Sequence, residues 1–105
     1  MRKLIFAVEG QKLSKQGDFS GITAGSKGSL KCCFAAKDDD WRMAKKVAIF
    51  GDGVLTKLDA NGECIVPDEM TDRKSFKVKL AGERTGPGGT GVRMMTNAVL
   101  VEQVV

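Results

Sequence analysis

Apolar and polar residues alternate along most of the chain with a period of two, which is the pattern of β-strands that bury one face. The clearest run is 75–81, in which Phe76, Val78 and Leu80 alternate with serine, lysine and alanine. Further strands are predicted at 4–8, 30–35, 46–50, 54–58, 63–66 and 92–103. Short strands at intervals of roughly ten residues predict an all-β fold, either an antiparallel sandwich or a small barrel.

The residues between the predicted strands favour turns. Gly51-Asp52-Gly53 separates two apolar runs and predicts a tight hairpin, and Asn61-Gly62 is the pair that a type I′ turn prefers. The glycine-rich segment 82–91 is expected to be a mobile loop, and 15–27 a long irregular connection. The only helix candidate is 38–46, which we expect to form one or two turns.

The last predicted strand, 92–103, is apolar on both faces. One face carries Val92, Met94, Ala98, Leu100 and Val104, and the other carries Met95, Val99, Val101 and Val105. The outer face of a two-layer sandwich is normally wet, so an apolar outer face needs a cover, and a partner subunit is the simplest one. This interpretation assigns Met95, Val99 and Val101 to a protein interface. We add Arg84 and Arg93, the arginines that flank the glycine-rich loop, to the same predicted interface. The alternative is a bulge near Thr96-Asn97 that switches the two faces midway.

Length and composition suit one globular domain that spans 1–105. The chain has 105 residues, of which 42% are hydrophobic and 29% are charged. It contains no histidine, which excludes His-based catalytic triads and His-dependent zinc sites. The formal net charge is +4, but the basic residues are spread from Arg2 to Arg93 in runs of no more than two. Small nucleic-acid-binding proteins more often concentrate such residues on one face or tail.

Residues that could carry chemistry are few. Gly86, Gly88 and Gly91 match the glycines of a dinucleotide-binding fingerprint, but a strand rather than a helix is predicted after them. Asp38-Asp39-Asp40 suits a solvated or helix-capping turn, with a cation site as the alternative. Trp41 is either a lid on the core or a platform for a base or sugar. We therefore predict no catalytic residue, no cofactor and no metal site.

The three cysteines are Cys32, Cys33 and Cys64, and an odd number without the spacing of a disulfide framework predicts reduced thiols. Cys32 and Cys33 are adjacent on one predicted strand and point to opposite faces, so we expect Cys32 in the core. Cys33 is expected to be a buried or interface thiol, since no histidine base is present. The apolar stretch 4–8 is too short for a signal peptide, and no segment is long enough to span a membrane, so we expect a chain made and kept inside the cell.

Residues distributed over nearly the whole chain resemble a known family. They are Gly10-Gln11, 24–27, 30–31, Phe34, Trp41 upstream of Ala48 and Phe50, 61–67 with Glu69, Phe76 and Val78 with Gly82, and Thr96-Asn97 with Val99 and Val101. This set resembles the small immunoglobulin-like domains of tailed phages and prophages, and it is similar to the N-terminal domain of baseplate upper proteins. The resemblance implies an immunoglobulin-like antiparallel sandwich of seven to eight strands.

The resemblance also implies a non-enzymatic virion part that acts through protein–protein contacts at a baseplate, tail or head surface. Its partners would be other virion proteins in a homo- or hetero-oligomer assembled in the bacterial host cytoplasm, rather than nucleic acid or a membrane. The alternative is a small barrel that binds single-stranded nucleic acid through basic residues and Trp41. Against this alternative, four of the five phenylalanines alternate as core residues of predicted strands, which leaves few rings for stacking.

Overall fold

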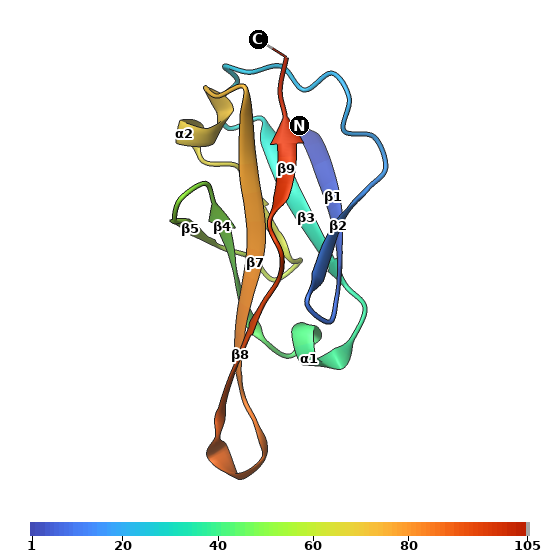
Figure 1. Ribbon diagram of the computed structural model, residues 1–105, viewed down its shortest axis with the longest axis vertical. Coiled ribbons are helices and arrows are strands. Elements are labelled where there is room, and N and C mark those ends of the chain that lie inside the picture. The colour runs from blue at the N-terminus through green and yellow to red at the C-terminus, as the bar shows by residue number, and fades with distance from the viewer. Residues whose placement is uncertain (105) are drawn as a thin grey trace.

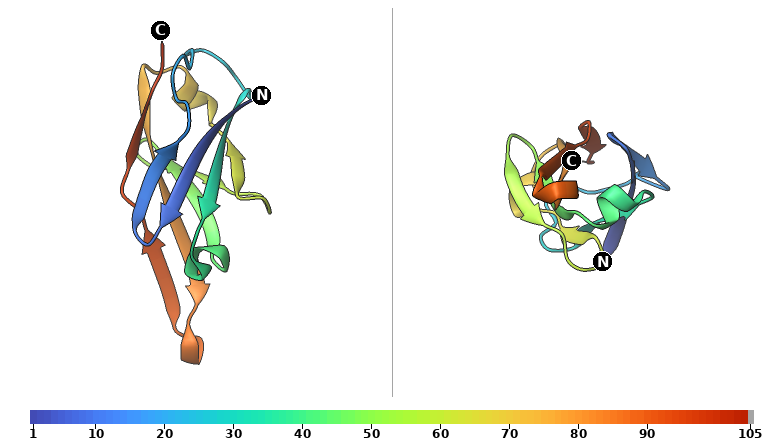
Figure 2. Two further views of the ribbon diagram at one scale, coloured as in Figure 1. Left: turned by 90° about the vertical axis from the view of Figure 1, so that its right-hand side faces the viewer. Right: turned by 90° about the horizontal axis from the view of Figure 1, so that it is seen from below.

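The computed structural model describes residues 1–104 as two β-sheets packed face to face (Figure 1; Figure 2). The first sheet has the order β2-β1-β3-β6, from β1 (Arg2–Glu9), β2 (Lys12–Gln16), β3 (Leu30–Ala36) and β6 (Glu63–Ile65). The second has the order β5-β4-β7-β8, with β9 also on β7, from β4 (Lys45–Phe50), β5 (Val54–Lys57), β7 (Ser75–Thr85), β8 (Gly91–Met95) and β9 (Val99–Glu102). The predicted all-β sandwich is therefore confirmed.

One strand and one pairing were not predicted. Strand β2 lies between the predicted strand 4–8 and the predicted irregular connection 15–27 and overlaps only the first two residues of that connection. It was not predicted because Leu13 is its only core residue, and one apolar residue shows no alternation. Strand β1 pairs antiparallel with β2 but parallel with β3, in a register that sets Phe6 beside Phe34. Each of the other strand pairs in the described residues is antiparallel, so the expectation of a wholly antiparallel sandwich is wrong at this pair.

The core lies between the sheets and is built from the alternating residues that the sequence predicts. The Phe6 and Phe34 rings stack with centroids 5.1 Å apart, and the Phe50 and Phe76 rings meet at 6.1 Å. All four phenylalanines are at most 5% exposed. Burying each such ring contributes roughly 1.5–3 kcal/mol, which makes this inner layer the main source of stability.

The predicted strand 92–103 is broken into β8 and β9, and the break switches its faces. Val101 is fully buried in the chain's own core and Val99 packs against that core, whereas Met95 is 37% exposed on the outer side. The expectation that Met95, Val99 and Val101 share one partner-facing surface is therefore wrong, and the alternative with a switch near Thr96-Asn97 is confirmed. Val105, assigned to the same face, lies outside the described residues.

The break is held by side chains that replace ladder groups. Oγ1 of Thr96 accepts a hydrogen bond from the Leu80 backbone N–H at 2.9 Å and donates one to the Asn97 carbonyl. The Asn97 side chain reaches the first sheet, where Oδ1 accepts from the Leu13 N–H at 2.8 Å and Nδ2 donates to the Leu13 carbonyl at 3.1 Å. Asn97 thus joins the edges of the two sheets on one side of the sandwich.

Two short helices connect strands at opposite ends of the molecule (Figure 1). Helix α1 (Asp39–Arg42) falls inside the predicted helical segment, and Asp38 is its N-cap. Helix α2 (Asp68–Thr71) was not predicted, although a proline followed by two acidic residues is a helix-start signal. Nε2 of buried Gln103 donates hydrogen bonds to the carbonyls of Met70 and Arg73, which satisfies the end of this helix.

Both predicted turns form, but one has a different type. The Gly51-Asp52-Gly53 hairpin joins β4 to β5 as expected. At Asn61-Gly62 only the glycine has a positive φ, of 76°, so the expected type I′ turn, which needs two such residues, is wrong. Oδ1 of Asp59 accepts hydrogen bonds from the N–H groups of Asn61 and Glu63 and closes the turn from its first residue.

Candidate interaction surface

Residues 83–93 form a hairpin arm at one end of the molecule. Strand β7 continues to Thr85 and β8 begins at Gly91, so only 86–90, which contain the short 3₁₀ helix η1 (Pro87–Gly89), lie outside the strands. The expectation of a loop over the whole of 82–91 is therefore wrong. Strand β4 begins at Lys45, opposite Glu83, so the arm projects beyond the other strands and accounts for the elongated shape of 50 × 24 × 22 Å (Figure 1).

The base of the arm is locked to the core by Gly82 and Trp41. A Cβ atom at Gly82 would lie 2.8 Å from Cζ3 of Trp41 and 3.2 Å from Cβ of Ala44, so only glycine leaves room for the indole. Nε1 of Trp41 donates a hydrogen bond to the Gly10 carbonyl at 2.6 Å. The side chain is 1% exposed, so Trp41 is a lid on the core and offers no platform to a base or sugar.

The acidic cluster Asp38-Asp39-Asp40 forms the predicted capping turn. Oδ1 of Asp38 accepts from the Trp41 N–H, and Oδ2 accepts from the Gly10 N–H at 2.9 Å. Asp39 pairs with a side chain of its own helix, whereas Oδ1 of Asp40 lies 2.8 Å from Nη2 of Arg84 at the base of the arm. The three carboxylates thus face different partners, and residues 1–104 contain no group of three metal-binding side chains.

The two arginines predicted at an interface are paired within the chain. Arg84 is held by Asp40, and Nη2 of Arg93 lies 2.8 Å from Oε1 of Glu83 across the arm. Arg84 therefore braces the arm, while Arg93, whose side chain is 74% exposed, remains accessible. The irregular connection 17–29 lies at the end of the molecule opposite the arm (Figure 1).

A broad surface lies on the outer side of the second sheet, which we call the outer β4–β7 face. It consists of the side chains that point away from the core: Lys45, Val47, Ile49, Leu55, Lys57, Lys77, Lys79, Ala81, Glu83, Arg93, Met95, Leu100 and Glu102. Towards the arm this face continues into an open groove of about 800 Å³, where Met43 and Lys45 face the arm residues.

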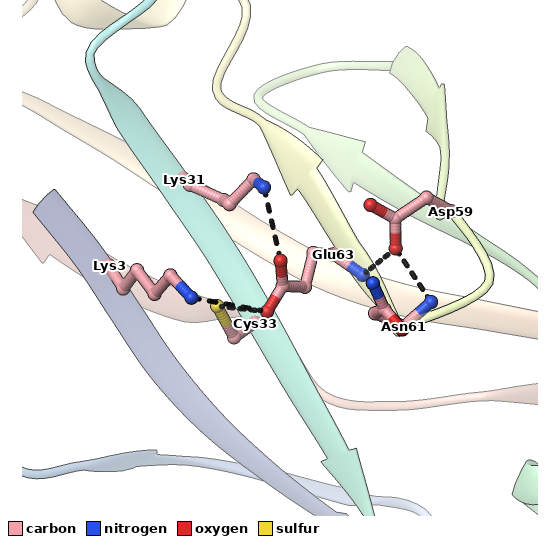
Figure 3. Close-up of polar contacts among 6 residues, drawn as sticks. All are labelled: Lys3, Lys31, Cys33, Asp59, Asn61 and Glu63. Atoms are coloured by element: carbon pink, nitrogen blue, oxygen red, sulfur yellow. Dashed lines mark hydrogen bonds and ion pairs between the residues drawn. The ribbon is translucent and has the colours of Figure 1, made fainter. Parts of the chain in front are cut away.

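The outer face of the first sheet carries a compact polar cluster (Figure 3). Glu63 from β6 receives three groups: Nζ of Lys31 at 3.1 Å, Nζ of Lys3 at 3.8 Å, and the thiol of Cys33, which donates at 3.3 Å. The Lys31 contact, followed by the Cys33 hydrogen bond, lowers the pKa of Glu63, and the same carboxylate raises the pKa of Lys31. The cluster therefore places both lysines against a carboxylate of the chain itself.

The thiols are held in their protonated forms. Burial, followed by the hydrogen bond to Glu63, raises the pKa of Cys33, which is the opposite of what a nucleophilic thiolate needs. Burial also raises the pKa of Cys64 to about 12 and that of Cys32 well above its ordinary value. Cys32 and Cys64 lie opposite each other in the β3–β6 ladder, and Cys32 is in the core as predicted.

No family model, curated protein or solved structure matches this chain. Within residues 1–104, neither helix is long and apolar enough to cross a bilayer.

The outer β4–β7 face was missed by reasoning from the sequence, although a signal for it exists. Residues 47–50 form an uninterrupted apolar run, so both faces of β4 are apolar, and the next strand adds Leu55 on the outer side. Strand 92–103 shows the same apolarity on both faces, but there a break explains it, whereas β4 is paired without a break.

Proposed function

We propose that the chain is a non-enzymatic structural module that assembles with other proteins through protein–protein contacts, as an immunoglobulin-like part of a tailed-phage virion. The observation that carries the proposal is the arm. No residue of 83–93 belongs to the hydrophobic core, yet the arm is built as a paired hairpin and braced by the Arg84–Asp40 contact.

The energetics of the arm favour an external use. Ordering each residue costs roughly 1–2 kcal/mol in backbone entropy, and glycine loses more freedom than other residues. Four glycines lie in 86–91, and the arm contributes no core side chain that would offset this cost. A neighbouring protein that covers the arm supplies the missing contacts, and the resemblance to virion domains supports a neighbour within a particle.

The polar groups support assembly rather than chemistry. The accessible thiol, Cys33, donates to Glu63 and has a raised pKa, and the acidic cluster caps a helix and braces the arm. The alternative of a single-stranded nucleic-acid-binding barrel is not favoured, because Trp41 is buried and the described phenylalanines are buried or half-buried.

The experiment shortens the arm without disturbing its base. Replacing 85–91 with Asn-Gly joins Arg84 to Val92, which face each other across the arm, and retains both the Arg84–Asp40 contact and Gly82. Source cells that produce the wild-type chain or the variant are lysed, and nuclease-resistant particles are separated on a density gradient. The variant Pro87→Ala, which keeps the arm length, is the control.

We expect the wild-type chain and Pro87→Ala to sediment with the particles, and the shortened variant to stay at the top of the gradient while its circular dichroism remains that of the wild type. A wild-type chain that is found only at the top contradicts the proposal. So does a shortened variant that sediments with the particles as the wild-type chain does.

A further inference from the structure

We propose that the outer β4–β7 face docks an acidic protein surface that has an apolar centre. This inference rests on the proposed function, because it names the chemistry of a partner that an assembly module would hold. It concerns a different surface from the arm tip, so the two proposals can fail separately.

The centre of the face is apolar and partly solvent-exposed. Across the sheet, Leu55 lies opposite Ile49, and Val47 lies opposite Ala81, which in turn lies opposite Met95. Leu55 is 66% exposed, and Leu100, which is 42% exposed, lies on β9 on the far side of the β7 lysines. Apolar side chains that adjoin over several strands and are rimmed by polar ones are typical of a protein-binding surface.

The rim of the face is basic and lacks internal partners. Lys57 lies opposite Val47 and Lys79 opposite Ile49, so lysines border the apolar residues of β4 on both sides. Lys77 lies opposite Leu100 and stands between it and these residues. Within residues 1–104, no carboxylate oxygen lies within 4.0 Å of Nζ of Lys45, Lys57, Lys77 or Lys79. The five basic side chains of the face stand against two acidic ones, Glu83 and Glu102, and Glu83 is already paired with Arg93. Carboxylates of a partner would complement this excess of positive charge.

A second copy of the chain fits this face less well. A symmetric dimer brings the same patch of both subunits together, which would set lysines against lysines around a small apolar centre. Like charges that meet across an interface cost several kcal/mol, so the charge pattern disfavours self-association through this surface.

A nucleic acid also fits less well. Single strands bind sheet faces through exposed aromatic rings on which bases stack. The outer β4–β7 face has no aromatic side chain, and each aromatic residue of the chain is buried or half-buried. The exposed aliphatic side chains of the centre suit a protein partner instead.

The experiment follows backbone amide shifts of the ¹⁵N-labelled chain during titration with defined probes. The acidic probe is a synthetic peptide that repeats Glu-Glu-Leu, and its control repeats Lys-Lys-Leu. A third probe is an oligodeoxythymidylate. The double variant Lys77→Glu with Lys79→Glu is compared with Lys12→Glu plus Lys15→Glu, which changes the net charge equally on the other sheet. Leu55→Ser is compared with Ile5→Ser, which is 39% exposed before substitution.

We expect the acidic peptide to shift amides of 45–57, 77–81 and 95–102, and the Lys77/Lys79 variant to weaken its binding at least tenfold. Leu55→Ser should weaken binding as well, while both control variants bind as the wild type does. High salt should reduce the affinity, because the rim is exposed.

The inference is overturned if the basic peptide shifts the same amides, if the oligonucleotide binds there more tightly than the peptide, or if these amides shift with protein concentration alone. The chain with the shortened arm separates the two proposals, since it should still bind the acidic peptide. Peptide binding by a chain that never enters particles contradicts the proposed function only. Particle entry by the Lys77/Lys79 variant at the wild-type level contradicts this inference only.

Discussion

The outer faces of the two sheets use similar residues but treat their charges differently. On the first sheet, Lys3 and Lys31 converge on Glu63, which lies between them (Figure 3). On the second sheet, Lys77 and Lys79 share one strand face, and within residues 1–104 no carboxylate oxygen lies within 4.0 Å of either Nζ. The cluster on the first sheet pairs its lysines with a carboxylate of the chain, whereas the lysines of β7 are left to solvent or to a partner.

This difference separates residues that serve the fold from residues that serve an interface. A paired charge on an exposed sheet adds a small amount of stability, so its removal lowers the free energy of unfolding. An unpaired lysine makes no such contribution to stability, so its removal should change only the affinity for a partner. The two faces therefore predict opposite responses to the same type of substitution.

The largest loss of stability is expected from substitutions in the core, which lies between the two sheets. Trp41→Ala removes a side chain that is 1% exposed and leaves the Gly10 carbonyl without its indole donor. We expect a loss of about 3–5 kcal/mol in the free energy of unfolding, measured by urea denaturation. Gly82→Ala should cost about 1–3 kcal/mol through the clash with the same ring. In the double variant Trp41→Leu with Gly82→Ala, the alanine should cost less than it does beside Trp41.

A smaller loss is expected at the seam between the sheets. Asn97→Ala deletes the two hydrogen bonds to the backbone of Leu13 and leaves both groups without these partners. We expect a loss of about 2 kcal/mol, together with faster amide hydrogen exchange in β2. Asn61→Ala, at an exposed turn, is the matched control and should lose less than about 0.5 kcal/mol. Unchanged exchange in β2 would mean that Asn97 does not hold the two edges together.

Charge reversal tests the comparison of the two faces directly. Lys31→Glu sets a second carboxylate beside Glu63 and should lower Tm at low salt, with a smaller decrease in 0.5 M NaCl. Lys79→Glu should leave stability within about 0.5 kcal/mol of the wild type, because it breaks no pair and introduces a carboxylate near the lysines of the outer β4–β7 face. Equal decreases in Tm for the two variants would remove the distinction between the faces.

The smallest effect is a pH dependence of the Lys31–Glu63 pair. The pKa of Glu63 is lowered from 4.5, so its contribution is present above that value and is lost as pH falls through the lowered pKa. The pKa of Lys31 is raised from 10.5, so its contribution is present below that value and is lost as pH rises through the raised pKa. The Tm difference between wild type and Lys31→Gln should therefore persist between about pH 4.5 and 10.5 and shrink below this window. A difference that stays constant down to pH 2 would show that packing, not charge, sets it.

The sequence predicted the inner faces well because alternation reports burial directly. Phe6, Phe34, Phe50 and Phe76 all lie in the core, as their spacing indicates. The capping role of Asp38 also follows from a local pattern, since a helix start is a short-range feature.

Contacts between segments that are far apart in the chain could not be predicted from the sequence. Gly82 looks like the first residue of a loop, but it lies inside β7 because the Trp41 ring fills the space where a Cβ would be. Asn97 looks like a bulge residue, but its side chain also joins two sheets through Leu13, which lies 84 positions away. Neither role has a local signature.

Alternation by itself determined which residues of a strand share a face, because successive side chains of a strand point to opposite sides. It did not determine which strands are neighbours, which is decided by packing of whole sheets. Only the tertiary structure therefore revealed the parallel pairing of β1 with β3, the convergence of Lys3, Lys31 and Cys33 on Glu63, and the unpaired lysines of the outer β4–β7 face.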